Sequence, residues 1–201
     1  SNHNWTLPEP TAASYTQELI DNAKSFSDTA MVVISRVGGE MADLPTNMDG
    51  LNYTENSTEY NDFEPGQHYL SLTKTEKNMI DMVTKNFANV VLVYNGANTL
   101  EMGFVNDYPQ IKSVIWCPGT GQTGFNALGE IVAGEVNPSG HSADTFVYDL
   151  TAAPYFNNIG DFAYTNADSV GYTVASQAGG DAKLVPPHFV NYVEGIYVGY
   201  K

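Results

Sequence analysis

Five apolar residues follow one another without a polar interruption at Ala30-Met31-Val32-Val33-Ile34. A short unbroken run of this kind, rich in β-branched residues, indicates a strand that is covered on both faces, as strands of parallel sheets are. Two later runs have the same character, Val90-Val91-Leu92-Val93-Tyr94 and the shorter Val114-Ile115-Trp116. We also expect a strand over residues 143–148.

Helical patterns alternate with these runs. Apolar residues at helical spacing predict a helix over residues 15–26, and Thr73 and Glu76 form a T-x-x-E capping box that opens a second helix. Residues 121–133 are predicted as a third helix, with Gly134 as its C-terminal cap. The alternation predicts a doubly wound α/β layer whose parallel strands are joined by crossover helices.

We expect the chain to have three parts. Residues 1–14 are interpreted as a cloning remnant and a polar lead-in, and residues 15–150 as the α/β domain. Residues 151–201 lose the alternation and predict an irregular tail that wraps the domain. Inside the α/β domain, residues 36–69 show no periodicity, and a loop of that length is uncommon in a compact domain unless it has a function.

The charge of the chain narrows the classes of partner. Its 201 residues include 23 acidic and 8 basic ones, which gives a net charge of −15. Because this charge repels phosphate backbones and anionic lipids, we expect no nucleic-acid partner and no membrane contact. The few lysines and many Asn, Thr and Tyr favour an extracellular or cell-surface bacterial protein over a cytoplasmic one, without fixing the compartment.

Two features could indicate a cofactor or a metal. Residues 119–124 match G-x-G-x-x-G between a strand and a helix, where backbone N–H groups can hold a pyrophosphate. The same residues also suit a tight turn, and here they follow the third strand, whereas the fingerprint normally follows the first. Cys117 is the single cysteine and the histidines lack ligand spacing. We therefore expect no cofactor and no metal.

A glycine-rich segment, Gly38-Gly39-Glu40-Met41-Ala42-Asp43, follows the first predicted strand. Loops at the carboxyl ends of strands line the ligand crevice of open α/β sheets. A carboxylate there can act as a general acid/base when burial or a second carboxylate raises its pKa. Glu40 is therefore a candidate catalytic residue, and the alternative is an ordinary solvated acid.

Several blocks of residues occur in a fixed order along the chain. They are Ser35-Arg36-Val37-Gly38-Gly39-Glu40-Met41-Ala42-Asp43, then Tyr69-Leu70-Ser71-Leu72 with Glu76, Val91-Leu92-Val93-Tyr94-Asn95-Gly96, Trp116-Cys117-Pro118-Gly119, and Gly134-Glu135-Val136-Asn137-Pro138-Ser139-Gly140 with Asp144-Thr145-Phe146. This series resembles the C-terminal domain of family 3 glycoside hydrolases, which include the β-glucosidases. The resemblance runs from about residue 15 to the end, where residues 194–200 resemble a segment leading toward a fibronectin-like domain.

The resemblance implies a mostly parallel, six-stranded α/β/α sandwich packed against a (β/α) barrel domain of the same parent chain. It implies a carbohydrate substrate and hydrolysis of O-glycosidic bonds, such as those of β-glucosides, with retention. In this family the barrel holds the aspartate nucleophile, and the sandwich commonly supplies the acid/base glutamate, which corresponds to Glu40. We further expect Asp43 and Arg36 to contact the substrate.

The chain departs from the family pattern in ways that keep alternatives open. Met41 replaces the usual Gly after the glutamate, and Leu44 stands in place of an Arg. The acid/base position varies in the family, so Glu55, Glu59 and Glu64 in the same long loop remain candidates. No segment resembles the barrel, and we expect the fragment to be inactive by itself. The alternative function is a non-catalytic carbohydrate-binding or interaction module on the same fold.

Overall fold

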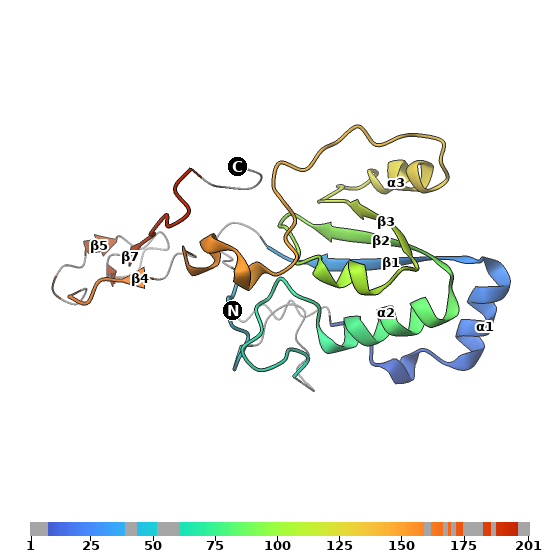
Figure 1. Cartoon of the computed structure of the whole chain (residues 1–201), viewed down its shortest axis with the longest axis horizontal. Helices are drawn as coiled ribbons and strands as arrows, with labels where there is room; N and C mark the ends of the chain where they lie inside the picture. The colour runs from blue at the N-terminus through green and yellow to red at the C-terminus, as the bar shows by residue number, and fades with distance from the viewer. Residues whose placement is uncertain are drawn as a thin grey trace. The chain divides into compact units, whose positions relative to one another are not determined.

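A computed structural model of the chain describes residues 8–38, 44–51, 61–158, 162–166, 169, 172–174, 183–185 and 188–196. The chain divides into two compact units, Ser1–Asp149 and Leu150–Lys201. The candidate site belongs to the first unit, whose α-helices and strands are labelled in Figure 1.

A parallel sheet forms the centre of the first unit. It contains β1 (Thr29–Arg36), β2 (Asn89–Gly96) and β3 (Ile111–Trp116) in the order β1-β2-β3, and both neighbouring pairs are parallel. The three apolar runs of the sequence thus form the three strands. The predicted α/β class with a mostly parallel sheet is confirmed, while the described residues show three strands in this sheet rather than six.

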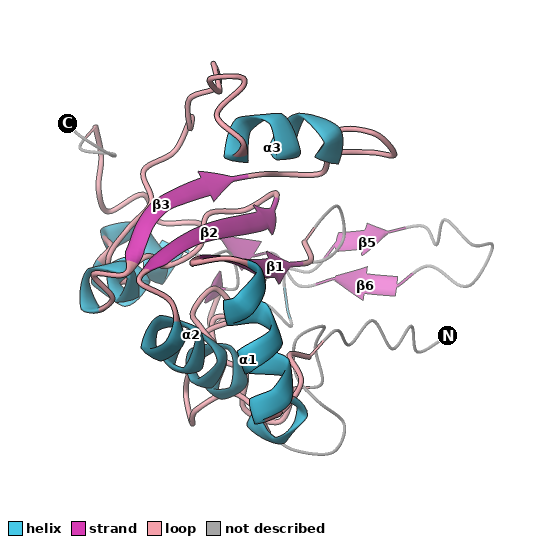
Figure 2. Ribbon diagram, turned by 90° about the vertical axis from the view of Figure 1, so that its right-hand side faces the viewer, coloured by secondary structure: helices cyan, strands magenta, loops and turns pink. Residues whose placement is uncertain are grey.

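Helices precede, connect and follow these strands. The short 3₁₀ helix η1 (Ala12–Ser14) and α1 (Gln17–Phe26) precede β1, and α2 (Lys74–Asn86) connects β1 to β2. The 3₁₀ helix η2 (Gly103–Asp107) connects β2 to β3, and α3 (Phe125–Val132) follows β3. Figure 2 shows α3 next to β3, apart from α1 and α2.

The predicted capping box opens α2. The Thr73 hydroxyl accepts a hydrogen bond from the Glu76 backbone N–H at 3.2 Å, and the Glu76 carboxylate accepts one from the Thr73 N–H at 2.9 Å. These two bonds satisfy backbone donors that the first turn of a helix leaves without intrahelical partners. The start of α2 is therefore fixed at a defined residue.

The main hydrophobic core lies between one face of the sheet and α2 with η2. Val32, Leu92 and Tyr94 from the strands pack with Ile80 of α2 and with Leu100. On β1 the side chains alternate, because successive residues of a strand point to opposite faces. Val32 and Ile34 are buried, whereas the neighbouring Met31 and Val33 are 46% and 49% exposed. β1 is thus covered on one face rather than on both.

The prediction of a strand over residues 143–148 is wrong, because this segment forms no strand. Its carbonyls instead accept hydrogen bonds from the segment after β2, with Met102 N–H bonded to Val147 O at 2.9 Å and Gly103 N–H to Tyr148 O at 3.2 Å. Phe146 packs edge-on against Trp116, with ring centroids 5.4 Å apart. The segment therefore closes over the end of the core without joining the sheet.

The second unit contains only short elements among its described residues. They are two 3₁₀ helices, η3 (Leu150–Ala152) and η4 (Pro154–Asn158), and two antiparallel pairs, β4 (Phe162–Ala163) with β7 (His188–Phe189) and β5 (Tyr172–Val174) with β6 (Lys183–Val185). The described residues of this unit therefore form only short helices and strands. Among the described residues of the whole chain, no helix is both long enough and apolar enough to cross a membrane.

Candidate active site

The candidate site lies where β1 ends. The register of β1 with β2 stops at the pair Arg36 and Gly96, and Val37 and Gly38 continue the chain toward Glu40. This is the carboxyl edge of a parallel sheet, where open α/β folds bind ligands. Glu40 and Asp43 lie outside the described residues, as do Glu55 and Glu59. The described part of the site consists of the residues that surround the end of β1.

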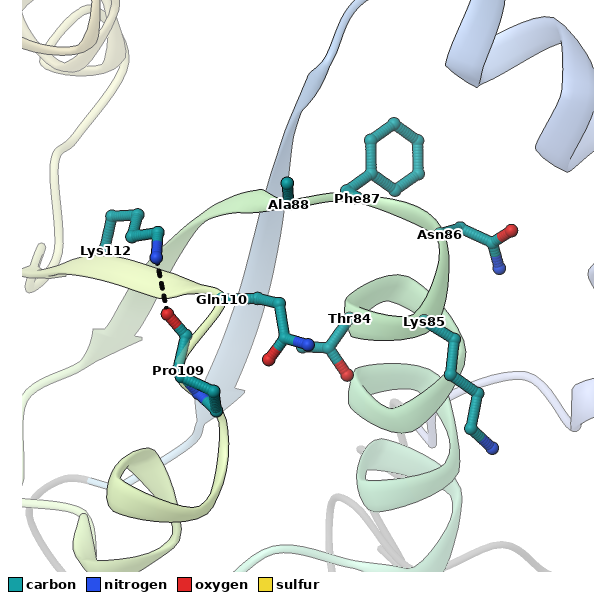
Figure 3. Close-up of a pocket in the computed structure, with 8 residues that line it drawn as sticks. All are labelled: Thr84, Lys85, Asn86, Phe87, Ala88, Pro109, Gln110 and Lys112. Carbon is teal, nitrogen blue, oxygen red and sulfur yellow. Dashed lines mark hydrogen bonds between the residues drawn. The ribbon is translucent and has the colours of Figure 1, made fainter.

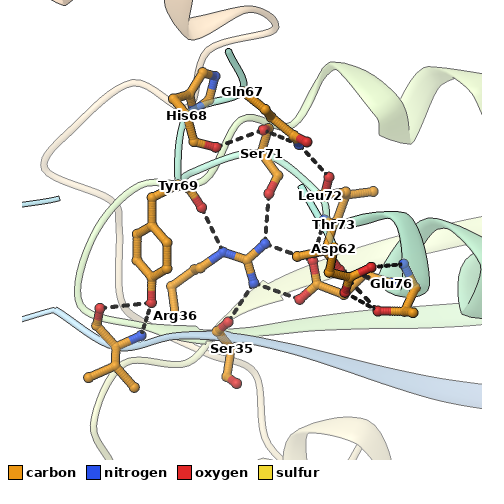
Figure 4. Close-up of polar contacts among 12 residues, drawn as sticks. Ser35, Arg36, Asp62, Gln67, His68, Tyr69, Ser71, Leu72, Thr73 and Glu76 are labelled. Carbon is orange, nitrogen blue, oxygen red and sulfur yellow. Dashed lines mark hydrogen bonds and ion pairs between the residues drawn. The ribbon is translucent and has the colours of Figure 1, made fainter. Parts of the chain in front are cut away.

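Arg36 is anchored deep in the protein at the last position of β1. Its guanidinium forms a two-pronged ion pair with the Glu76 carboxylate, at 2.6 and 2.7 Å. It also donates to the carbonyls of Tyr69 at 2.9 Å and Ser71 at 2.7 Å (Figure 4). Such an arrangement compensates a buried charge, because it combines the opposite charge with further hydrogen bonds. The substrate contact expected of Arg36 stays a prediction.

Tyr69 holds Val37, the residue that follows Arg36. Its side chain is fully buried, and its hydroxyl accepts a hydrogen bond from the Val37 N–H and donates one to the Val37 carbonyl, both at 3.0 Å. The Tyr69 ring belongs to a small second core with Met48 and Phe63. This core organises part of the long loop, which the sequence showed only as a stretch without periodicity.

Two acids of the long loop differ in their surroundings. Asp62 is buried and accepts hydrogen bonds from the Thr75 N–H, at 3.0 Å, and from the Thr75 hydroxyl. Its carbonyl also accepts from the Lys74 N–H at 2.9 Å. Glu64, the acid/base alternative within the described residues, is exposed. Asp62 therefore ties the loop to the start of α2, whereas Glu64 lies at the surface.

The end of β2 approaches the same edge through Asn98. A Cβ atom on Gly38 would overlap the Asn98 amide nitrogen, so the glycine permits a close approach of the two segments. That nitrogen is buried and has no hydrogen-bond partner among the residues that the structure describes. An unpaired amide donor therefore lies beside the chain that leads to Glu40. Spacing arguments did not identify Asn98, and Tyr69 entered the sequence analysis only through a family motif.

The glycine-rich segment after β3 forms a tight turn into α3. Gly121 adopts a positive φ of 63°, and the Gly124 N–H bonds to the Thr120 carbonyl at 3.1 Å. A Cβ on Gly124 would collide with that carbonyl. The tight turn itself therefore requires glycine at these two positions. Within the described ranges, no cluster of three or more His, Cys, Asp or Glu side chains could hold a metal ion.

A pocket of about 470 Å³ lies at the opposite edge of the sheet. Figure 3 shows its lining between the end of α2 and the segment that enters β3, where Lys112 Nζ donates to the Pro109 carbonyl at 2.7 Å. This is the edge of the strands' amino ends, so the pocket is separate from the end of β1. Its lining residues are Thr84, Lys85, Asn86, Phe87, Ala88, Pro109, Gln110 and Lys112.

Comparison with known proteins identifies the family. The model of the glycosyl hydrolase family 3 C-terminal domain matches residues 10–200. The chain belongs to this family. The predicted resemblance is thereby confirmed over nearly the whole chain, and the match includes Arg36, Glu40, Tyr69 and Glu76.

Several relatives of this family 3 domain are β-glucosidases. The chain is 28% identical over 192 residues to β-glucosidase A of Butyrivibrio fibrisolvens, which covers 92% of this chain and 20% of that protein. It is 30% identical over 141 residues to a β-glucosidase of Ruminococcus albus, covering 70% and 13%. The structure of a β-glucosidase from Paenibacillus barengoltzii matches with a TM-score of 0.60 at 27% identity, over 79% of this chain and 15% of that chain.

The lengths of these relatives show what the family 3 domain represents. The chain spans about a fifth or less of each of the three proteins compared. It therefore corresponds to one domain of larger glycosidases.

Proposed function

We propose that this domain completes the active site of a retaining β-glycosidase that acts on β-glucosides, with Glu40 as the acid/base. The observation that carries the proposal is the family match over residues 10–200, which includes a glutamate in the loop after β1. The names of the relatives supply the substrate class. The domain would act with a barrel domain of the same parent chain, and the isolated domain would be inactive.

The proposed chemistry divides two carboxyl groups between two domains. In a retaining glycosidase one carboxylate attacks the anomeric carbon while an acid protonates the leaving oxygen, and the same acid then deprotonates the incoming water. The two carboxyl groups are about 5–5.5 Å apart in such enzymes. Glu40 would be the proton donor and acceptor, and an aspartate of the barrel would be the nucleophile. Asp43 and Arg36 are the proposed substrate-binding residues.

The test is Glu40→Gln in the full-length protein that contains this domain. A neutral amide cannot donate the proton, so kcat/KM for methyl β-glucoside should fall about 10²–10⁴-fold. The same constant for 2,4-dinitrophenyl β-glucoside should change little, because a good leaving group departs without protonation. Both constants come from steady-state kinetics on the two substrates.

The matched control is Glu130→Gln, which neutralises an exposed glutamate of α3. It should leave both rate constants unchanged. Normal turnover of methyl β-glucoside by the Glu40 variant would exclude Glu40 as the acid/base. The same assay on Glu55→Gln, Glu59→Gln and Glu64→Gln would then show which loop acid, if any, has the leaving-group dependence.

A second candidate is a non-catalytic carbohydrate-binding or interaction module. Met41 and Leu44, which depart from the family pattern around Glu40, favour it. In that case the full-length protein would bind a β-glucoside in calorimetry but would not cleave one, and Glu40→Gln would leave binding intact.

A further inference from the structure

The strand that leads to Glu40 is held beyond the end of the sheet by a side chain. The register of β1 with β2 ends at Arg36 and Gly96, so Val37 lies past the last paired residues. Its N–H and its carbonyl both bond to the Tyr69 hydroxyl at 3.0 Å. A tyrosine hydroxyl can donate one hydrogen bond and accept others, so this single group serves both backbone groups of Val37.

Tyr69 is itself held from several directions. Its carbonyl accepts from Arg36 Nε at 2.9 Å, and its N–H donates to the Pro45 carbonyl at 3.0 Å. The Arg36 guanidinium carbon lies 5.6 Å from the centre of the ring. The ring also packs in the small core with Met48 and Phe63. The hydroxyl therefore has a defined position, and its two hydrogen bonds hold the backbone of Val37 next to it.

We propose that Tyr69 is a positioning residue for Glu40, because its hydroxyl fixes Val37 and so sets the direction in which the chain leaves β1. The inference rests on the proposed acid/base role of Glu40, three residues further along the chain. A proton donor must come within about 2.6–3.2 Å of the leaving oxygen. A displacement of about 1 Å can cost 10²-fold in rate, so the start of this loop matters for proton transfer.

The test is Tyr69→Phe in the full-length protein. The ring stays in its core, but the backbone N–H and carbonyl of Val37 lose their hydrogen bonds to the Tyr69 hydroxyl. We expect kcat/KM for methyl β-glucoside to fall about 10–100-fold and that for 2,4-dinitrophenyl β-glucoside to fall less than about threefold. Equal losses on both substrates, or no loss on either, would overturn the proposal, because a purely structural role does not distinguish leaving groups.

Two comparisons make the result specific. Tyr108→Phe removes another tyrosine hydroxyl, the one that donates to Asp81 Oδ1 at 2.6 Å, and should leave the ratio of the two substrates unchanged. In a Glu40→Gln background, Tyr69→Phe should lower the methyl β-glucoside rate less than about twofold further, since the group it positions is already inactive. A full additional loss there would contradict action through Glu40.

The outcomes also separate this inference from the proposed function. If Glu40→Gln shows no leaving-group dependence, the acid/base assignment fails regardless of Tyr69. If Glu40→Gln shows it and Tyr69→Phe does not, only the positioning role fails. Should Tyr69→Phe not fold, Phe63→Leu loosens the packing around the Tyr69 ring and keeps the hydroxyl. It should lower the methyl β-glucoside rate more than the dinitrophenyl rate, and equal losses would again overturn the proposal.

Discussion

Gly96, the last residue of β2, is required by the close approach of the Tyr94 ring. A Cβ atom at position 96 would lie 2.6 Å from Cζ of Tyr94 and closer still to its hydroxyl oxygen. The Tyr94 side chain is fully buried, so it cannot swing away into solvent. The glycine therefore allows a large aromatic side chain to close the core at the carboxyl edge of the sheet.

We expect Gly96→Ala to lower the free energy of unfolding by about 1–3 kcal/mol, as overpacking of a filled core does. Urea denaturation followed by circular dichroism measures it. Gly129→Ala is the matched control, because a Cβ there meets nothing within 4 Å and the residue lies inside α3. That change should stabilise α3 by about 0.5–1 kcal/mol. Equal effects of the two substitutions would contradict the packing argument.

The sequence identified single residues of the site better than their partners. Arg36 was expected at the site and Glu76 was expected as a helix cap, but their ion pair joins residues that are 40 positions apart. Local spacing carries no information on such a pair. The same holds for the Tyr69 hydroxyl and Val37, because one tyrosine among 13 has no distinguishing pattern.

At the scale of elements, a hydrogen bond ties α2 to the segment that follows η2. The Tyr108 hydroxyl donates to Asp81 Oδ1 at 2.6 Å. Burial, together with this hydrogen bond and the negative charge of Asp81, raises the pKa of Tyr108 well above its ordinary value. The folded state therefore favours the neutral phenol, which can donate the bond.

The contribution of this bond should depend on pH. Because the folded pKa is raised, the stabilisation is fully present below the ordinary tyrosine pKa of about 10 and is lost as the pH rises beyond it. We expect Tyr108→Phe to cost about 1 kcal/mol at pH 8 and clearly less at about pH 11. Urea denaturation of both proteins at the two pH values tests this. A difference that is the same at both would contradict it.

The strands were predictable where burial alone determines them. The runs that became β1, β2 and β3 are unbroken and apolar, and each forms a strand of the parallel sheet. The run over residues 143–148 combines Phe146, Val147 and Tyr148 with the polar Asp144 and Thr145, and its carbonyls bond to Met102 and Gly103 after β2. Composition cannot tell a strand from a segment that closes a core, because both bury apolar side chains and satisfy their backbone groups.

At the scale of the whole molecule, the chain matches only one part of each larger relative. It covers 20% of the Butyrivibrio relative and 15% of the Paenibacillus structure. The proposed reaction needs a second carboxyl group as nucleophile, which we place in another domain. The family was predictable from ordered motifs, whereas no segment of the sequence resembles the barrel that would hold the nucleophile.

We expect the 201-residue chain by itself to give no measurable hydrolysis of 4-nitrophenyl β-glucoside. Removing one member of a catalytic pair typically eliminates most of the rate enhancement. The measurement is a long incubation of the purified chain, with circular dichroism as the control for folding. Turnover by the folded chain that Glu40→Gln abolishes would show that the attacking group is also present here.

The anchoring of the long loop on both flanks has a practical consequence for protein engineering. On one side Tyr69 and Glu76 fasten the end of β1, and on the other Asp62 fastens the entry to α2. A graft between Leu51 and Asn61 would replace Glu55 and Glu59, two of the alternative acid/base candidates, while both supports are made by residues outside the graft. Doubling the length of a flexible insertion costs only about 0.6 kcal/mol in closure entropy. This position is accordingly suited to library diversification without rebuilding the scaffold.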